Sequence, residues 1–198
     1  MIKRIRTILW LFVALAALAA AGLWLRAEQI APAPVAAAPV AIGAPFTLTA
    51  SDGSRFASAG MAGTPYAMFF GFTHCPDVCP TTLARLAKLR RQLPRGDTSF
   101  AILFVTVDPE RDTPAEMARY AAAFATPIVA LTGTPAEIAS VTKSFGIYAK
   151  KVTQPGGSYS MDHSAATLLF DRSGKFVATI APDEGDAPAL AKLKRITG

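Results

Sequence analysis

The sequence contains few of the residues that build metal clusters and disulfide networks. Of its 198 residues, two are cysteine and two are histidine. Both cysteines, Cys75 and Cys79, lie in one short segment, so no separate resolving thiol supports a thiol peroxidase. The first 26 residues contain no cysteine, which excludes a lipid group attached there through a thioether.

Basic residues outnumber acidic ones, but they do not form the cluster that nucleic-acid binding requires. The formal net charge is +6, and Lys3, Arg4 and Arg6 supply three of the surplus charges. The richest basic run lies within residues 85–95, and we interpret it as the solvated face of a helix. A nucleic-acid interface needs basic residues gathered on one face, so we predict no nucleic-acid partner.

An uncharged apolar run follows the basic N-terminus. Residues 7–25 carry no charge, and as a helix they would span about 28 Å, close to the hydrocarbon thickness of a bilayer. Trp10 and Trp24 lie near the two ends, where indole rings favour the membrane interface. We predict a single-pass anchor over residues 1–26 with its N-terminus in the cytoplasm. A cleaved signal peptide is the alternative, because the small residues at 16–21 suit a cleavage site.

The next segment is rich in alanine and proline. Three prolines among alanines in residues 27–43 favour an extended, semi-rigid chain, so we predict a linker there. The remaining residues, 44–198, are enough for one domain with its own core.

Strand patterns and helix patterns alternate within residues 44–198. Buried-strand patterns cover residues 66–72, 100–107 and 128–131, and helical patterns cover residues 80–93, 114–125, 134–145 and 187–196. Residues 165–170 and 175–180 flank a turn and predict a β-hairpin. This order predicts an α/β fold with a thioredoxin-like mixed sheet flanked by helices, preceded by one transmembrane helix.

The two cysteines lie where a buried strand gives way to a helix, in GFTHCPDVCPTTL. Residues four apart lie on one helical face, about 5–6 Å from each other, so the thiols of Cys75 and Cys79 converge. The helix N-terminus stabilises a thiolate, which serves both as nucleophile and as metal ligand. The pair therefore predicts either a redox disulfide or a site for a soft metal ion. A purely structural disulfide is a weaker reading, because so short a loop gains little stability from closure.

A third candidate ligand comes from much later in the chain. His163 lies in YSMDHSAATLLF, just before the terminal hairpin, and a thioredoxin-like topology brings that loop to the edge that carries the cysteines. Two thiolates and an imidazole suit Cu(I) or Cu(II). The alternative for His163 is a structural hydrogen-bonding role. We expect His74 to face solvent or to be structural, and Asp77 to cap the helix.

Three segments together resemble the Sco/SenC family, the membrane-anchored assembly factors of cytochrome c oxidase. Residues 71–83 resemble the copper motif of the family, residues 104–114 (FVTVDPERDTP) its second signature, and residues 159–176 the segment that holds its third ligand. The resemblance implies a thioredoxin fold in which Cys75, Cys79 and His163 hold copper.

The resemblance also implies a function. We expect a metallochaperone, which is a binding protein and not an enzyme, that takes copper from an upstream donor. It would deliver the copper to the dinuclear copper centre of cytochrome c oxidase subunit II, from a bacterial-type inner membrane with the domain in the periplasm. The alternative is a thiol–disulfide oxidoreductase that keeps the subunit II cysteines reduced through a redox disulfide of Cys75 and Cys79. His163 favours the metallochaperone, because a thiol–disulfide exchange protein needs no imidazole. Such a protein also usually carries its two cysteines as CxxC, whereas Cys75 and Cys79 are separated by three residues.

The second signature contains a charged patch: Asp108, Glu110, Arg111 and Asp112. One interpretation is a helix-capping turn with local ion pairs, and the other, suggested by the resemblance, is part of a partner surface. The sequence favours neither.

Overall fold

The structure is a computed structural model that describes residues 2–29 and 42–198. Contacts divide the chain into two units, Met1–Val40 and Ala41–Gly198, and each is described by itself. Most of the predicted linker over residues 27–43 lies outside the described residues.

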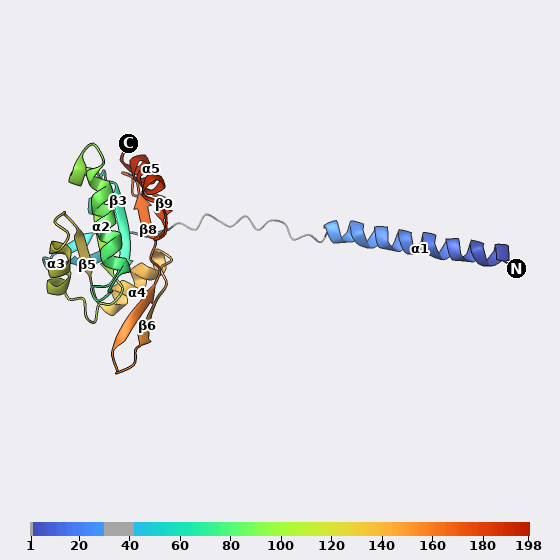
Figure 1. The fold of residues 1–198 in the computed structure, drawn as a ribbon, viewed down its shortest axis with the longest axis horizontal. Coiled ribbons are helices and arrows are strands. Elements are labelled where there is room, and N and C mark those ends of the chain that lie inside the picture. Colours follow the sequence, from blue (N-terminus) through green and yellow to red (C-terminus); the bar gives the residue numbers. More distant parts are fainter. Residues whose placement is uncertain (1, 30–41) are drawn as a thin grey trace. The chain divides into compact units, whose positions relative to one another are not determined.

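Helix α1, Ile2–Gln29, forms the described part of the first unit (Figure 1). It continues three residues past the predicted end of the anchor at residue 26. Its apolar side chains, among them Trp10, Phe12 and Leu18, are exposed. Within the described part of the chain, α1 is the one helix with a span long and apolar enough to cross a membrane, Arg4–Gly22.

The second unit is built on a seven-stranded sheet with the order β2-β1-β5-β4-β3-β8-β9. Its strands are β1 Thr47–Ala50, β2 Arg55–Ala57, β3 Tyr66–Gly71, β4 Ala101–Thr106, β5 Val129–Thr132, β8 Thr167–Phe170 and β9 Phe176–Ile180. Strand β3 pairs in parallel with β4 and antiparallel with β8, and all six of its residues are buried. A strand buried on both faces explains why the sequence there is a continuous apolar run.

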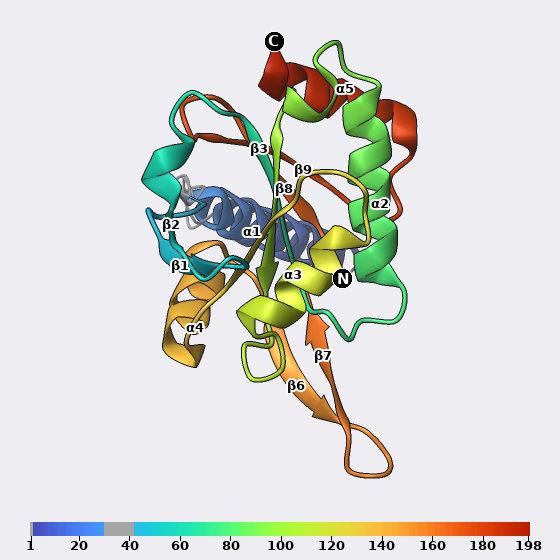
Figure 2. The same ribbon diagram turned by 90° about the vertical axis from the view of Figure 1, so that its left-hand side faces the viewer.

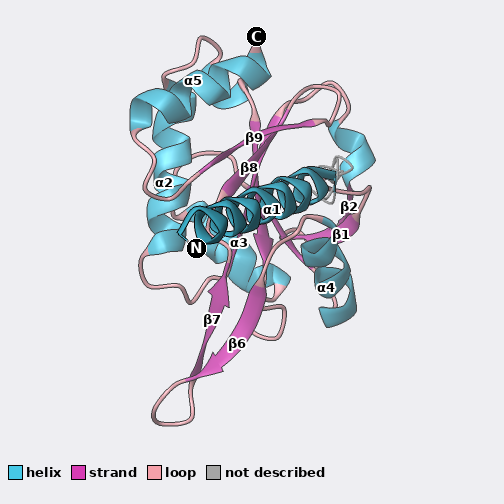
Figure 3. Cartoon of the chain, turned by 90° about the vertical axis from the view of Figure 1, so that its right-hand side faces the viewer, coloured by secondary structure: helices cyan, strands magenta, loops and turns pink. Residues whose placement is uncertain are grey.

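Helices flank this sheet on both sides (Figures 2 and 3). They are α2 Val78–Arg91, α3 Pro114–Ala122, α4 Pro135–Ser144 and α5 Asp186–Thr197, with short 3₁₀ helices at Ser58–Met61 and Gly96–Thr98. The hydroxyls of Thr113 and Thr134 cap α3 and α4, and Glu137 completes the predicted capping box on α4. The predicted architecture of a mixed sheet flanked by helices is confirmed.

Aromatic rings fill the core between the sheet and its helices. Tyr66 of β3 stacks on Phe170 of β8 with ring centroids 4.6 Å apart, and Phe69 stacks on Phe104 of β4 at 6.2 Å. Such pairs add to the stability that their buried area provides. The Phe69–Phe104 pair lies near the end of β3, where the loop that carries the cysteines begins.

Two hairpins were not predicted. One joins β1 and β2 at an edge of the sheet, and the other joins β6, Ala149–Thr153, to β7, Tyr159–His163. The β6–β7 pair forms a separate two-stranded sheet that projects from the body of the domain (Figures 2 and 3). His163 is therefore the last residue of a strand, whereas the sequence predicted a loop.

The basic run on α2 corrects a second expectation. Arg90 is buried and donates to the carbonyl oxygens of Phe100 at 3.1 Å and Pro127 at 2.8 Å. It ties α2 to the segments around β4 and β5, so this run is only partly the solvated face that the sequence predicted.

Candidate metal centre

The cysteine pair lies in the loop between β3 and α2 and in the first turn of that helix. Strand β3 ends at Gly71, Cys75 lies in the loop, and Cys79 is the second residue of α2. The backbone N–H of Cys79 donates to the Sγ atom of Cys75 at 3.4 Å, as expected for an unpaired donor at a helix N-terminus. Both cysteines are free thiols; Cys79 is buried and Cys75 is half-buried.

Gly71 allows the Cys79 thiol to lie directly against the end of β3. A Cβ atom at position 71 would be 2.7 Å from Sγ of Cys79 and 3.0 Å from the rings of Phe69 and Phe104. No other residue type leaves that space open, and glycine in a strand often marks such a close approach.

His163 reaches the thiols because successive residues of β7 face opposite sides. Tyr159, Met161 and His163 lie on the side that faces the domain, and Ser160 and Asp162 lie on the other. The Nε2 atom of His163 is 3.8 Å from Sγ of Cys79. The structure thus brings together residues separated by 84 positions in the sequence.

The hydrogen bonds of His163 fix which nitrogen carries the proton. Its Nδ1 lies 2.9 Å from the backbone carbonyl oxygen of Ser164. A carbonyl oxygen only accepts hydrogen bonds, so Nδ1 carries the proton and Nε2 presents its lone pair towards Cys79. Histidines that bind metals use the same arrangement. The edges of the Phe69 and Phe72 rings hold the imidazole, with centroid distances of 6.3 and 5.8 Å.

Burial strongly raises the pKa of the Cys79 thiol, and the neighbouring Cys75 and Asp112 raise it further. At Cys79, burial therefore outweighs the thiolate stabilisation that the helix N-terminus was expected to provide. Asp112 is itself fully buried and accepts hydrogen bonds from the backbone N–H of Thr73 at 3.0 Å and its hydroxyl at 2.6 Å. The hydroxyl of Thr106 donates to the same carboxylate at 2.6 Å.

The spacing of Cys79 and His163 suits one shared ion. With zinc-like bond lengths of about 2.3 Å to sulfur and 2.0 Å to nitrogen, two ligands at about 120° lie roughly 3.7 Å apart. Their distance of 3.8 Å agrees with this value. No three His, Cys, Asp or Glu side chains in residues 2–29 and 42–198 already enclose a metal position. A three-ligand site therefore requires the side chains of Cys75, Cys79 and His163 to close around the ion.

His74 and Asp77, the two other residues considered in the sequence, make different contacts. The imidazole of His74 is half exposed, and its Nδ1 lies 3.0 Å from the hydroxyl of Thr73. Asp77 occupies the position before α2, but its side chain makes no capping bond to a backbone N–H; its Oδ1 accepts from the hydroxyl of Thr81 at 3.3 Å. The predicted helix cap is therefore wrong in its hydrogen bonding.

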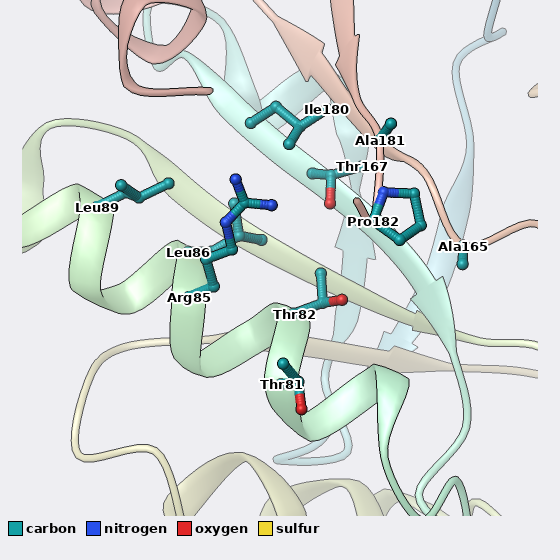
Figure 4. Close-up of a pocket in the computed structure, with 10 residues that line it drawn as sticks. All are labelled: Thr81, Thr82, Arg85, Leu86, Leu89, Ala165, Thr167, Ile180, Ala181 and Pro182. Carbon is teal, nitrogen blue, oxygen red and sulfur yellow. The ribbon is translucent and has the colours of Figure 1, made fainter. Parts of the chain in front are cut away.

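A cavity lies between α2 and the β8–β9 pair, and none of the three candidate ligands lines it (Figure 4). It is lined by Thr81, Thr82, Arg85, Leu86, Leu89, Ala165, Thr167, Ile180, Ala181 and Pro182. Its volume of about 30 Å³ is far below the roughly 300–1,000 Å³ of small-molecule sites. The thiol–imidazole cluster is therefore a better candidate site than this cavity.

Sequence reasoning identified the three candidate ligands but missed their supports. Gly71, the Ser164 carbonyl and the buried Asp112 were not singled out for these roles. The glycine was the one readable signal, because it ends an apolar strand that otherwise contains large residues.

Comparison with protein families identifies the chain. The SCO1/SenC family model matches residues 35–198, which include both cysteines and His163. The chain belongs to the SCO1/SenC family. Among curated relatives, the SCO1 homolog 1 of Arabidopsis thaliana mitochondria is 37% identical over 138 residues. That match covers 69% of this chain and 41% of the relative, so the chain spans less than half the length of that protein.

Solved structures support the same assignment. Bradyrhizobium japonicum ScoI, solved with copper bound, is 44% identical with a TM-score of 0.71, and the match covers 79% of this chain and 99% of that one. BsSco, described as a member of the Sco family of cytochrome c oxidase assembly proteins with a disulfide switch, is 25% identical with a TM-score of 0.61. That match covers 78% of this chain and 92% of BsSco. These likenesses confirm the predicted thioredoxin-like fold.

Proposed function

We propose that this chain is a membrane-anchored copper chaperone that carries one copper ion on Cys75, Cys79 and His163. The single observation that carries the proposal is the 3.8 Å approach of the His163 Nε2 lone pair to the buried Cys79 thiol. A soft thiolate pair suits Cu(I), and an added imidazole also suits Cu(II). The copper-bound relative ScoI supports the choice of metal.

The proposed recipient is the dinuclear copper centre of cytochrome c oxidase subunit II. The Sco family's description as cytochrome c oxidase assembly proteins supports an oxidase as partner. A three-ligand site leaves one position open on the ion, so an incoming ligand can bind before the old ligands leave. An upstream donor would load the site by the same exchange.

We also propose that α1 anchors the domain in a bacterial-type inner membrane. Lys3, Arg4 and Arg6 precede the uncharged run of residues 7–25, which favours an N-terminus in the cytoplasm and a domain in the periplasm. Mass spectrometry of the protein extracted from membranes tests this. An intact N-terminus supports the anchor, and a mature form that begins after residue 21 contradicts it.

Copper binding is tested by anaerobic loading of the full chain in detergent, followed by competition with a Cu(I) chelator. Wild type should retain one copper per chain, and Cys75→Ser or Cys79→Ser should retain none, because a single thiolate with an imidazole cannot hold Cu(I) against competing thiols. His163→Ala should retain less than wild type. His74→Ala is the matched control and should equal wild type, since His74 contacts Thr73 and not the thiols. Equal retention by His163→Ala and wild type would remove the imidazole from the site.

A second candidate function is thiol–disulfide exchange that keeps the subunit II cysteines reduced. The two free, adjacent thiols favour it, as does the disulfide switch described for BsSco. In that reaction Cys75 and Cys79 form a disulfide, and two electrons and two protons pass to a disulfide of the substrate. Metallation of subunit II in cells that lack this protein separates the two functions. Rescue by added copper alone favours delivery, and rescue by a thiol reductant alone favours exchange.

A further inference from the structure

The turn at residues 108–112 is bonded to the loop that carries the cysteines. Its last residue, Asp112, accepts two hydrogen bonds from Thr73, which lies two residues before Cys75. The carboxylate is fully buried, so water does not compete for these bonds. The turn therefore fixes the start of the thiol loop.

The same turn is bonded to the strand that carries the imidazole. The guanidinium of Arg111 donates to the carbonyl oxygen of Tyr159 at 3.0 Å, and its carbon lies 3.8 Å from the centre of the Tyr159 ring. The hydroxyl of Tyr159 donates to the buried carboxylate of Asp108 at 2.9 Å, and Arg111 is paired with that carboxylate as well. Tyr159 and His163 are the first and last residues of β7.

This contact matters because β6 and β7 do not pair with the main sheet. No backbone ladder sets the position of the hairpin, so side chains must set it. Lys151 of β6 adds to the same cluster, with Nζ 2.6 Å from a carboxylate oxygen of Glu110 and 3.9 Å from the centre of the Tyr159 ring. All of these contacts lie on the side of the hairpin that also presents His163.

Phe72 gives Arg111 a second connection to the imidazole. The guanidinium carbon lies 5.8 Å from the centre of the Phe72 ring, and the edge-on contact between Phe72 and His163 is also 5.8 Å. Arg111 thus contacts both the strand that carries His163 and the ring against which His163 packs.

We propose that Arg111 is a positioning residue that holds the β6–β7 hairpin so that His163 reaches the ion bound by Cys75 and Cys79. The inference rests on the proposed copper site and assigns a role to the charged turn of the second signature. Asp108 and Asp112 are buried and belong to an internal clasp, whereas Glu110 of the same turn is exposed.

The test compares copper binding by the full chain carrying Arg111→Ala, Arg111→Lys or Tyr159→Phe. The control is Arg119→Ala, which removes an exposed arginine whose partner is Glu116 on the same helix. The readouts are Cu(II) affinity by competition, the nitrogen hyperfine splitting in the Cu(II) electron paramagnetic resonance spectrum, and the melting temperature of the copper-free protein.

Arg111→Ala should lower Cu(II) affinity about 10–100-fold, the usual effect of removing an outer partner of a metal ligand, and should weaken the nitrogen splitting. Tyr159→Phe should produce a smaller loss in the same direction, and Arg119→Ala should equal wild type. Arg111→Lys keeps the charge beside Asp108 but loses the forked geometry. Compared with Arg111→Ala, Arg111→Lys should recover more of the wild-type melting temperature than of the wild-type nitrogen splitting. If Arg111 had only a structural role, the two quantities would recover together.

Each result has one meaning. Wild-type affinity and splitting in all three variants would overturn the positioning role and leave the proposed function standing. Failure of wild type itself to bind copper would overturn the proposed function. If Arg111→Ala does not fold, Arg111→Lys and Tyr159→Phe decide the question, because each removes only part of the clasp.

Discussion

Replacing Gly71 with alanine would insert a methyl group between the end of β3 and the Cys79 thiol. The new Cβ would lie 2.7 Å from Sγ of Cys79 and 3.0 Å from ring carbons of Phe69 and Phe104. Non-bonded carbon atoms prefer separations of about 3.5–4.0 Å, so the sulfur must retreat by about 1 Å and each ring by about 0.5 Å. All three neighbours are fully buried and have little room to move.

The expected cost follows from that overpacking. Extra methyl groups in a well-packed core destabilise by about 1–3 kcal/mol. For a domain of this size, each kcal/mol lowers the melting temperature by about 2–4 °C, so Gly71→Ala should melt about 2–12 °C below wild type. Displacement of Sγ also disturbs its 3.8 Å approach to His163, so copper affinity should fall together with stability.

Thermal unfolding of the full chain in detergent, followed by circular dichroism, measures the effect. Gly60→Ala is the matched control, because a Cβ at position 60 meets no atom within 4 Å. The decisive comparison is a double-mutant cycle with Cys79→Ala, which removes the sulfur atom from the clash. Gly71→Ala should cost less in the Cys79→Ala background than in wild type. Equal costs in both backgrounds, or equal melting of Gly71→Ala and Gly60→Ala, would refute the close-approach argument.

Two further predictions concern the supports of the site and the sheet. Asp112→Ala removes the acceptor of one buried donor, the Thr106 hydroxyl, and of two half-buried donors, the backbone N–H and hydroxyl of Thr73. It should lower the free energy of unfolding by about 3 kcal/mol in urea titrations, and a change below about 1 kcal/mol would contradict this reasoning. Hydrogen bonds from the backbone of Thr134 and the side chain of Arg55 lower the pKa of Glu137. The ionised carboxylate therefore stabilises the fold fully above the unfolded-state pKa of about 4.3. This stabilisation is lost as the pH falls through the lower pKa of the folded state. Unfolding measured from pH 7 to 3 should therefore show the free-energy difference between wild type and Glu137→Gln shrinking towards acid, and a constant difference would count against it.

Local signals made most of the fold predictable. The Thr-Pro pairs that begin at Thr113 and Thr134 indicated where two helices start. The hydroxyl cap and the φ angle fixed by proline both act within a few residues, so the signal is local. A strand that is buried on both faces is apolar at nearly every position, so its sequence shows a continuous apolar run and not an alternation of apolar and polar residues. Such runs identified β3 and β4 as the central strands.

The β6–β7 hairpin was not predictable, because its signals are not local. Every residue of β6 is exposed, and two of its five residues are lysines, so the segment has no buried face to produce an apolar pattern. Its place depends on Arg111 and Tyr159, which are 48 positions apart. Long-range contacts of this kind leave no periodic trace in a sequence.

The candidate site also has one part with a local sequence signal and another part that depends on long-range contacts. The thiol pair was readable because its two residues are four positions apart at the start of a helix. The thioredoxin-like topology already placed His163 at the edge that carries the thiols, but its setting at the end of β7 and its 3.8 Å distance from Cys79 came only from the structure. The close approach of Cys79 to Gly71 likewise depends on which segments the fold places side by side. The burial of Arg90 belongs to the same class, since its partners lie after α2 in chain order.

The unequal burial of the two thiols connects the two candidate functions. Cys75 is half-buried whereas Cys79 is enclosed by Gly71 and His163, so an incoming thiol or chelator reaches the sulfur of Cys75 first. Metal exchange and disulfide exchange both begin with attack by such an incoming sulfur. In either reaction, therefore, the incoming group meets Cys75 before it meets Cys79. The imidazole is the one group that only the metal reaction needs, and its orientation by Ser164 supports the proposal of copper delivery.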